Sequence, residues 1–342
     1  MKLKSIVLTL FILLFCFSFL NADTKEGKFL GAKDVTMPSW FMSSFLDLRE
    51  DINELSANNK RLIVFIHQPN CPYCHRFVTK NLEDQATKQK ILKNFAVVDI
   101  NMFGDKEVTD VDGNVYSEKE FATKYNVQFT PTLLFFDEKA DQILRLNGYM
   151  NIEKFNVALD YVSTKQEGKI AYKEYLVQKM ALQSKASLIE EPDLFTDTSN
   201  FVRKKGSGEF ALFFESANCK ACETLHNKLL KDKLSRELLK KIDLYQVDLD
   251  SDKSIVTPSK MIIKIKDWAD ELAITNSPTI IFFNESGDEI IRIEAMFKTF
   301  HFQSLVDYVV SGAYKEEKEF QRYLTQRANK IRAKGKDVNI WD

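Results

Sequence analysis

The hydrophobic and polar positions in the first part of the chain follow two different periods. Apolar residues recur at helical spacing over residues 41–58, and a short, almost wholly apolar run follows at 61–67. A second helical pattern extends from Cys71 to Phe95, before another apolar run at 96–100. Short apolar runs of this kind are typical of buried strands. The order strand, helix, strand predicts a right-handed crossover between parallel strands.

The pattern then becomes that of a hairpin. The apolar run at 133–136 and the largely apolar segment 143–146 are separated by a polar turn at 137–141. This spacing predicts two antiparallel strands. Helical patterns follow at about 152–163 and 166–184. The predicted unit is an α/β domain with a mixed central sheet flanked by helices.

This unit occurs twice. Cys219 follows Cys71 by 148 residues, and Pro278 follows Pro131 by 147 residues. The tripeptide Asp-Tyr-Val at 160–162 also recurs 147 residues later. A nearly constant offset indicates an internal duplication. We therefore expect the order and lengths of the elements to repeat in the second half.

A polar stretch at 183–200 separates the two copies. Polar segments between periodic regions are where domain boundaries usually fall. We therefore predict a first domain at residues 23–185 and a second domain at 186–342, after a separate N-terminal segment at 1–22.

That N-terminal segment has the pattern of a secretory signal. Lys2 and Lys4 precede an apolar run over residues 6–20, and the segment ends at Ala22. The run of about 15 residues is shorter than the roughly 20 that a membrane-spanning helix needs, which favours a signal peptide over an anchor. We expect cleavage near Ala22 and a periplasmic or secreted location.

Composition and charge narrow the class of partner. The 342 residues are 44% hydrophobic and carry a formal net charge of −1. This composition is that of a folded protein and shows no bias towards disorder. Without a basic excess, the chain gives no indication of a nucleic-acid partner.

Candidate chemistry is concentrated in two Cys-X-X-Cys pairs, Cys71/Cys74 and Cys219/Cys222. Each pair lies between a predicted buried strand and a helix, so the first cysteine falls at a helix N-terminus, where the dipole favours an anionic sulfur. The thiolate is the nucleophilic form of cysteine. We predict that Cys71 and Cys219 attack a disulfide, that Cys74 and Cys222 resolve the mixed disulfide, and that both attacking sulfurs are open to solvent.

Three other interpretations of the cysteines stay open. Each pair could be a structural disulfide, although a four-residue loop stabilises by only about 2 kcal/mol. Four cysteines could also form a zinc site, if the two copies faced each other. Because His75 follows Cys74, the first motif fits covalent haem attachment, but the second copy has Glu223 at the corresponding place. We expect redox cysteines with no metal and no cofactor.

The element order around these motifs resembles the thioredoxin fold, over nearly all of both halves. More narrowly, residues 65–74, the insertion at 105–110 and the segment 130–136 resemble exported thioredoxin-related proteins of the SoxW type. The resemblance implies two tandem thioredoxin-like domains and a role in periplasmic disulfide reduction. The partners it implies are client proteins with disulfides or thiols and a further redox partner, either soluble or membrane-bound.

The resemblance also implies that Pro131 and Pro278 follow cis peptide bonds beside the cysteines. Such a bend leaves the backbone of Thr130 and Ser277 free to bind an extended substrate segment. These four residues are the predicted substrate-binding residues.

Departures from the typical thioredoxin pattern affect the expected chemistry. Phe65 and Phe213 occupy the position of the buried acid six residues before the first cysteine, and Asn70 and Asn218 occupy that of the preceding tryptophan. The sequence of the motifs also differs between the copies, so we expect different reduction potentials. A disulfide oxidase or isomerase, or a non-catalytic binding module, remains an alternative to the reductase.

Overall fold

A computed structural model describes residues 25–180, 187–191, 193–217, 219–295 and 297–341. The predicted signal peptide lies outside these residues. Within them, no helix combines the length and apolar character needed to cross a bilayer.

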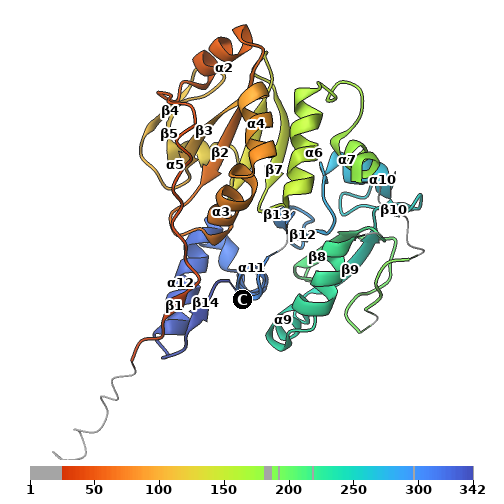
Figure 1. Ribbon diagram of the computed structural model, residues 1–342. Coiled ribbons are helices and arrows are strands. Elements are labelled where there is room, and N and C mark those ends of the chain that lie inside the picture. The colour runs from red at the N-terminus through yellow and green to blue at the C-terminus, as the bar shows by residue number, and fades with distance from the viewer. Residues whose placement is uncertain (1–24, 181–186, 192, 218, 296, 342) are drawn as a thin grey trace, which may run out of the picture.

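The first copy contains most of the predicted elements (Figure 1). In chain order these are β1 (Phe29–Leu30), α2 (Leu48–Ala57), β2 (Arg61–His67), α3 (Pro72–Phe77), the π-helical turn η2 (Val78–Leu82), α4 (Gln85–Asn94), β3 (Phe95–Asn101), β4 (Glu107–Thr109), β5 (Val115–Ser117), α5 (Glu118–Lys124), β6 (Thr132–Phe136), β7 (Gln142–Asn147), α6 (Ile152–Ser163) and α7 (Tyr172–Met180).

The second copy repeats this order from its central strand onward. Its elements are β8 (Phe210–Glu215), α8 (Lys220–Thr224), the π-helical turn η3 (Leu225–Leu229), α9 (Lys233–Leu239), β9 (Asp243–Asp248), β10 (Ser254–Val256), β11 (Ile262–Lys264), α10 (Ile265–Glu271), β12 (Thr279–Phe283), β13 (Glu289–Ile293), α11 (Thr299–Val310), η4 (Ala313–Lys315), α12 (Phe320–Arg332) and β14 (Val338–Asn339).

Each copy is built on a four-stranded mixed sheet, with strand order β3-β2-β6-β7 in the first and β9-β8-β12-β13 in the second. β2 pairs parallel with β3 and antiparallel with β6, as the strand pattern predicts. Successive side chains of β2 enter opposite cores because a strand alternates its faces. Ile63 and Phe65 pack with α3, α4 and α6, whereas Leu62, Val64 and Ile66 pack with α2 and α5. The predicted fold class is confirmed in both copies.

Several predicted helices are shorter than their hydrophobic patterns. The first begins at Leu48 rather than near residue 41, because the Asp47 side chain caps it. The helix predicted from Cys71 to Phe95 is divided by the π-helical turn η2, and Asp84 then caps a new helix, α4. The apolar pattern continues across this break, so periodicity alone did not reveal it.

The prediction that the element order repeats fails before β8. Within the described residues 193–209, no helix corresponds to α2. Phe201 instead packs on Trp268, with their ring centroids 6.0 Å apart. It lies in the same core as Phe214 of β8, so this single ring helps to cover the face that α2 covers in the first copy.

The two copies contact each other through equivalent positions. The side chain of Asn147 donates a hydrogen bond to Glu294, the residue 147 positions later. Gly148 has φ +77°, and a Cβ there would lie 2.5 Å from the Cβ of its own equivalent, Ala295. Contacts between equivalent residues are those of a two-fold axis. The duplicated domains are therefore packed around a local pseudo-two-fold axis.

The N-terminal segment departs from this pseudo-symmetry, because it packs against the second copy. β1 pairs in parallel with β14 at the far end of the chain. The Arg332 guanidinium lies 3.0 Å from Glu26 and donates a hydrogen bond to the Gly27 carbonyl oxygen. Residues before α2 thus contact the second copy as well as leading into the first. The predicted boundaries, 23–185 and 186–342, remain a prediction.

Tyr73, which lies between Cys71 and Cys74, anchors the first copy to the second. Its side chain is 9% exposed, and its hydroxyl accepts a hydrogen bond of 2.9 Å from the Lys298 backbone N–H. Its ring lies 5.2 Å from the imidazole of His301 and 5.1 Å from the indole of Trp341, measured between centroids. Burial lowers the pKa of His301 to about 4, so this interface contains a neutral imidazole at pH 7.

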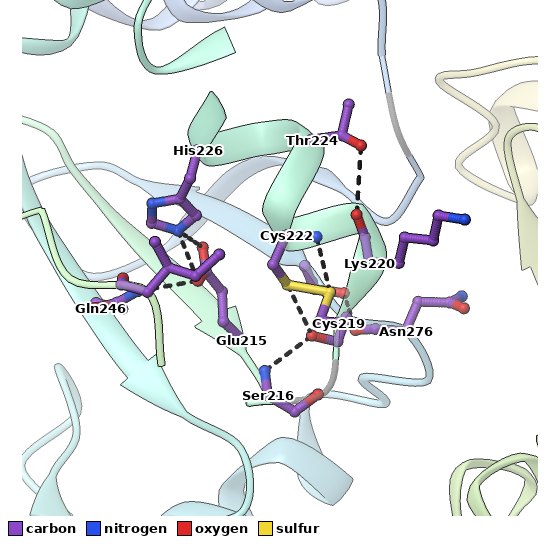
Figure 2. The surroundings of a disulfide bond; sticks show 12 residues. Glu215, Ser216, Cys219, Lys220, Cys222, Thr224, His226, Gln246 and Asn276 are labelled. Atoms are coloured by element: carbon purple, nitrogen blue, oxygen red, sulfur yellow. Dashed lines mark hydrogen bonds and ion pairs between the residues drawn. A yellow bond between two sulfur atoms is a disulfide. The ribbon is translucent and has the colours of Figure 1, made fainter. Parts of the chain in front are cut away.

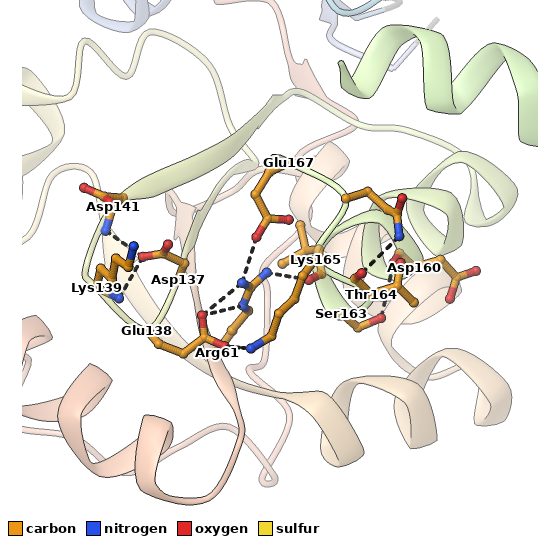
Figure 3. Close-up of polar contacts among 12 residues, drawn as sticks. Arg61, Asp137, Glu138, Lys139, Asp141, Asp160, Ser163, Thr164, Lys165 and Glu167 are labelled. Atoms are coloured by element: carbon orange, nitrogen blue, oxygen red, sulfur yellow. Dashed lines mark hydrogen bonds and ion pairs between the residues drawn. The ribbon is translucent and has the colours of Figure 1, made fainter. Parts of the chain in front are cut away.

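Arg61, at the start of β2, joins three other parts of the first copy (Figure 3). It is 5% exposed and lies 2.9 Å from Glu138 and 2.7 Å from Glu167. It also donates a hydrogen bond to the carbonyl oxygen of Val162 in α6. Hydrogen bonding from Arg61 lowers the pKa of Glu138 to about 2.

We predict that Glu138→Gln lowers the free energy of unfolding at pH 7 by about 1–3 kcal/mol, less than the full pKa shift would give because Glu138 is partly exposed. The carboxylate stabilises the fold above its unfolded pKa of 4.5, and this contribution is lost as the pH falls towards 2. The difference in free energy of unfolding between Glu138→Gln and wild type, measured with urea, should therefore shrink from pH 7 to pH 5 to pH 3. Asp141→Asn, in the same turn, should change stability by less than about 0.5 kcal/mol. A difference for Glu138→Gln that is constant with pH would contradict this account.

We also predict that Tyr73→Ala loosens the contact between the copies. Removing a buried aromatic side chain costs about 3–5 kcal/mol, whereas Tyr73→Phe loses only one hydrogen bond, worth about 1 kcal/mol. Hydrogen exchange of α11 and α12 should be faster in Tyr73→Ala and nearly unchanged in Tyr73→Phe. Equal protection in both variants would show that this ring does not hold the interface.

Candidate functional site

The two cysteine pairs lie at the carboxyl ends of the central strands, each at the start of a short helix. Cys71–Cys74 and Cys219–Cys222 are disulfides, with Cα–Cα distances of 5.3 and 5.0 Å. The Cys71 sulfur accepts a hydrogen bond of 3.0 Å from the Cys74 backbone N–H. The Cys219 sulfur accepts one of 2.9 Å from the Cys222 N–H. Each first cysteine is therefore the N-cap of its helix, in the position that favours an anionic sulfur.

The predicted proline loops lie against these sulfurs. The peptide bonds Thr130–Pro131 and Ser277–Pro278 are both cis, as the resemblance implies. The Thr130 hydroxyl donates a hydrogen bond of 3.2 Å to the sulfur of Cys71. The structure thus brings together the first predicted cysteine and the first predicted substrate-binding loop.

In the second copy the hydroxyl of the proline loop lies near the second cysteine of the pair rather than the first. Ser277 Oγ lies 3.3 Å from the sulfur of Cys222, and it accepts a hydrogen bond of 2.9 Å from the Ser216 N–H. A hydroxyl that donates to a thiolate stabilises it. The first centre can therefore stabilise its predicted attacking sulfur in this way, and the second its predicted resolving sulfur.

The expectation that the attacking sulfurs are open to solvent is wrong for the disulfide form. Cys71 is 2% exposed and Cys219 is 8% exposed. The surroundings also differ, because Pro72 and Tyr73 are buried whereas Lys220 is exposed. The sequence could not show this difference, since the cover over the first centre comes from the second copy.

A buried acid and a histidine lie beside the second centre (Figure 2). Glu215, the last residue of β8, is 1% exposed and lies 2.9 Å from the imidazole Nε2 of His226. His226 is fully buried and follows Cys222 by one helical turn. Gln246 donates a hydrogen bond of 2.9 Å to the Glu215 carboxylate. This pair was not predicted, although a glutamate ending an otherwise apolar strand was a usable signal.

In the first centre the acid and the histidine are exchanged: a histidine occupies the position of Glu215, and its partner is an aspartate. His67 replaces Glu215 and lies 3.3 Å from Asp99 of β3. Hydrogen bonding from His67 lowers the pKa of Asp99. Phe65 and Phe213 are fully buried, so the usual position of the acid is apolar in both copies. The two centres thus differ in the acid–base groups beside them.

The geometry also bears on the zinc and haem interpretations. Each sulfur is bonded within its own pair, and the described part of the chain holds no group of three or more His, Cys, Asp or Glu side chains suited to a metal ion. His75 lies on α3, partly exposed. The arrangement as it stands is that of two separate dithiol–disulfide centres.

Comparison with known proteins agrees with this fold. A thioredoxin-like domain model matches residues 48–163 and 197–310. No curated protein matches the chain. Among solved structures, a thioredoxin-fold protein from Helicobacter pylori is 21% identical, with a TM-score of 0.35, over 42% of this chain and 91% of that one. A thioredoxin from Thermus thermophilus is 21% identical, with a TM-score of 0.29, over 41% and 89%.

A third similar structure is the reduced C-terminal domain of DsbD from Neisseria meningitidis. It is 12% identical, with a TM-score of 0.26, over 33% of this chain and 91% of that one. The two family matches together cover most of the chain, one in each copy. The protein therefore belongs to the thioredoxin-like family and contains two domains of that family in tandem.

Proposed function

We propose that this protein is a protein thiol–disulfide oxidoreductase that works as a periplasmic disulfide reductase of the SoxW type. One observation carries the proposal: in both copies the first cysteine of a Cys-X-X-Cys pair caps a helix, beside a loop with a cis proline. A structural disulfide needs neither feature. The reductase direction and the location rest on the sequence resemblance and on the signal-like N-terminus.

The proposed reaction is dithiol exchange at each centre. The thiolate of Cys71 attacks a client disulfide, forms a mixed disulfide and releases one client thiolate. The Cys74 thiolate then attacks the Cys71 sulfur, which releases the second client thiolate and leaves the Cys71–Cys74 disulfide. Two electrons pass to the client in this cycle. Cys219 and Cys222 act in the same way at the second centre.

The substrate-binding role belongs to the proline loops. Thr130 and Pro131 in the first centre, and Ser277 and Pro278 in the second, would place an extended client segment beside the sulfur by backbone pairing. A separate redox partner must reduce both centres again, because each turnover leaves a disulfide. No cofactor is required for the exchange itself.

We predict that the two centres have different midpoint potentials. Redox titration of Cys71→Ser and Cys219→Ser in glutathione buffers should give midpoints that differ by more than about 15 mV, which is about a threefold change in the equilibrium constant. The reason is that the Thr130 hydroxyl can stabilise the thiolate of the first cysteine, Cys71, in one centre, whereas the Ser277 hydroxyl lies near the second cysteine, Cys222, in the other. Coincident midpoints would contradict the proposed inequivalence.

The same titration tests the direction. Midpoints near the value of about −270 mV that thioredoxin has would support a reductase, and midpoints above about −180 mV would show an oxidase or isomerase. The variants Cys74→Ala and Cys222→Ala should trap mixed disulfides with a reducible test protein such as insulin. A native protein whose disulfides resist excess dithiothreitol would be a non-catalytic binding module.

We also predict that Thr130→Val raises the pKa of the Cys71 thiol by about one unit, because a hydrogen bond to a charged group is worth about 1.5–3 kcal/mol. Thiolate absorbance near 240 nm, followed across pH in the reduced Cys219→Ser/Cys222→Ser background, measures this change. Thr130→Ser keeps the hydroxyl and should match the parent. If Thr130→Val and Thr130→Ser give the same pKa for the Cys71 thiol, the hydroxyl does not stabilise the Cys71 thiolate.

A further inference from the structure

A cavity of about 360 Å³ lies between the two copies and includes the first redox centre in its lining. The first copy contributes Cys71, Phe129 and Thr130, and α12 of the second copy contributes Gln321, Leu324 and Thr325. The N-terminal strand β1 adds Phe29. Figure 1 shows β1, α12 and β14 grouped beside the start of α3. Cys71, which is 2% exposed, thus lies in a wall of a pocket between the two domains.

The pocket is fixed in place by contacts across the interface. The Gln321 side chain donates a hydrogen bond of 2.9 Å to the Gln128 carbonyl oxygen and accepts one of 3.2 Å from Gln68. The ring of Phe129 lies 5.0 Å from that of Phe297 and 5.6 Å from that of Phe320. Gln321 therefore connects the segments that precede Cys71 and Thr130. The second copy holds both segments in place.

The accessible surface of the lining is more apolar than polar, and it offers no free charge. Phe29 and Phe103 are 41% and 44% exposed, unusually open for phenylalanine, and both line this cavity. Arg332 is the one formally charged side chain among the lining residues, since His301 is neutral at pH 7. The Arg332 guanidinium is already bound to Glu26 and to the Gly27 carbonyl oxygen. A ligand with several charges, such as glutathione, would lose hydration without gaining an ionic partner.

Two buried polar atoms of the lining residues lack a hydrogen-bond partner, Gln68 Oε1 and His301 Nδ1. The Oε1 atom of Gln68 is buried and accepts no hydrogen bond. A buried acceptor without a donor is costly unless something supplies one. A backbone N–H of an extended polypeptide is a neutral donor that would satisfy this atom within an apolar site.

We propose that the cavity is the substrate pocket of the first centre and selects a neutral, apolar, cysteine-bearing segment of an extended client polypeptide. The volume is near the lower end of the range for ligand pockets, so a cysteine and its neighbouring side chains fit, whereas a folded surface does not reach the sulfur. The second copy thus supplies the side of the pocket that selects the substrate of the first centre. This inference rests on the proposed function, because it names the substrate class of the same site.

The chemistry at the pocket is one thiol–disulfide exchange. A thiolate of the client, RS⁻, attacks Cys71 of the oxidised centre, so that an R–S–S–Cys71 bond forms and the Cys71–Cys74 bond breaks. The electron pair of the broken bond leaves on Cys74 as a thiolate. This is the reverse of the last step of client reduction, and it passes through the same mixed disulfide. Rates measured in this direction therefore report on the same pocket.

The test uses the full chain with Cys219→Ser/Cys222→Ser, so that only the first centre reacts. Three thiols are compared at equal thiolate concentration: the blocked tripeptide acetyl-Leu-Cys-Phe-amide, glutathione and dithiothreitol. Thr325 is exposed and lines the pocket, whereas its neighbour Gln326 is exposed on α12 and outside the lining. Thr325→Glu and Gln326→Glu thus add the same charge inside and outside the pocket.

We expect the tripeptide to react at least tenfold faster than glutathione. Thr325→Glu should slow the tripeptide at least fivefold and slow it more than it slows dithiothreitol, whereas Gln326→Glu should change neither rate by more than twofold. If the tripeptide is no faster than glutathione, or if Thr325→Glu acts no differently from Gln326→Glu, the pocket inference is overturned and the proposed function stands. If even dithiothreitol fails to reduce the native centre, the proposed function itself is wrong.

Discussion

The whole site depends on how a short helix begins. The first backbone N–H groups of a helix have no partner within the helix, and here the sulfur of the preceding cysteine accepts one of them. The largely buried central strand, β2 or β8, fixes the direction in which the chain enters the helix, and the cis-proline loop of the adjacent strand lies against the cysteine pair. The same constraint is met twice in the chain. Thiol chemistry is therefore a consequence of local geometry in each copy.

Duplication produced two similar folds but two different sites. Asn147 and Glu294 contact each other across a pseudo-two-fold axis, yet Tyr73 has only Ala221 as its counterpart in the second copy. The bulky tyrosine inserts into the second copy and places the first centre inside an interface. The second centre instead has Lys220 exposed at its helix start and a buried acid–histidine pair nearby. The two centres therefore differ in burial and in the charged groups beside them.

Sequence patterns predicted what depends on local periodicity. The strand at 61–67 and the helix at 152–163 agree with the structure at both ends, because apolar period and capping residues are local signals. The prediction failed where distant segments decide the outcome. The burial of Tyr73, between the two cysteines of the first centre, depends on Lys298, His301 and Trp341, far along the chain. The pairing of Glu215 with His226 depends on how a π-helical turn directs a side chain. Neither relation leaves a periodic trace in the sequence.

The most direct test of the central claim is the pH dependence of alkylation of the reduced, native chain, resolved at each cysteine by mass spectrometry. We expect the rate of reaction with iodoacetamide to be half-maximal below about pH 7.5 at Cys71 and Cys219, and at a higher pH at Cys74 and Cys222, because a helix N-terminus stabilises the thiolate. If all four cysteines titrate near the ordinary value of about 8.5, the helix starts do not activate sulfur, and a duplicated fold without redox chemistry is what remains.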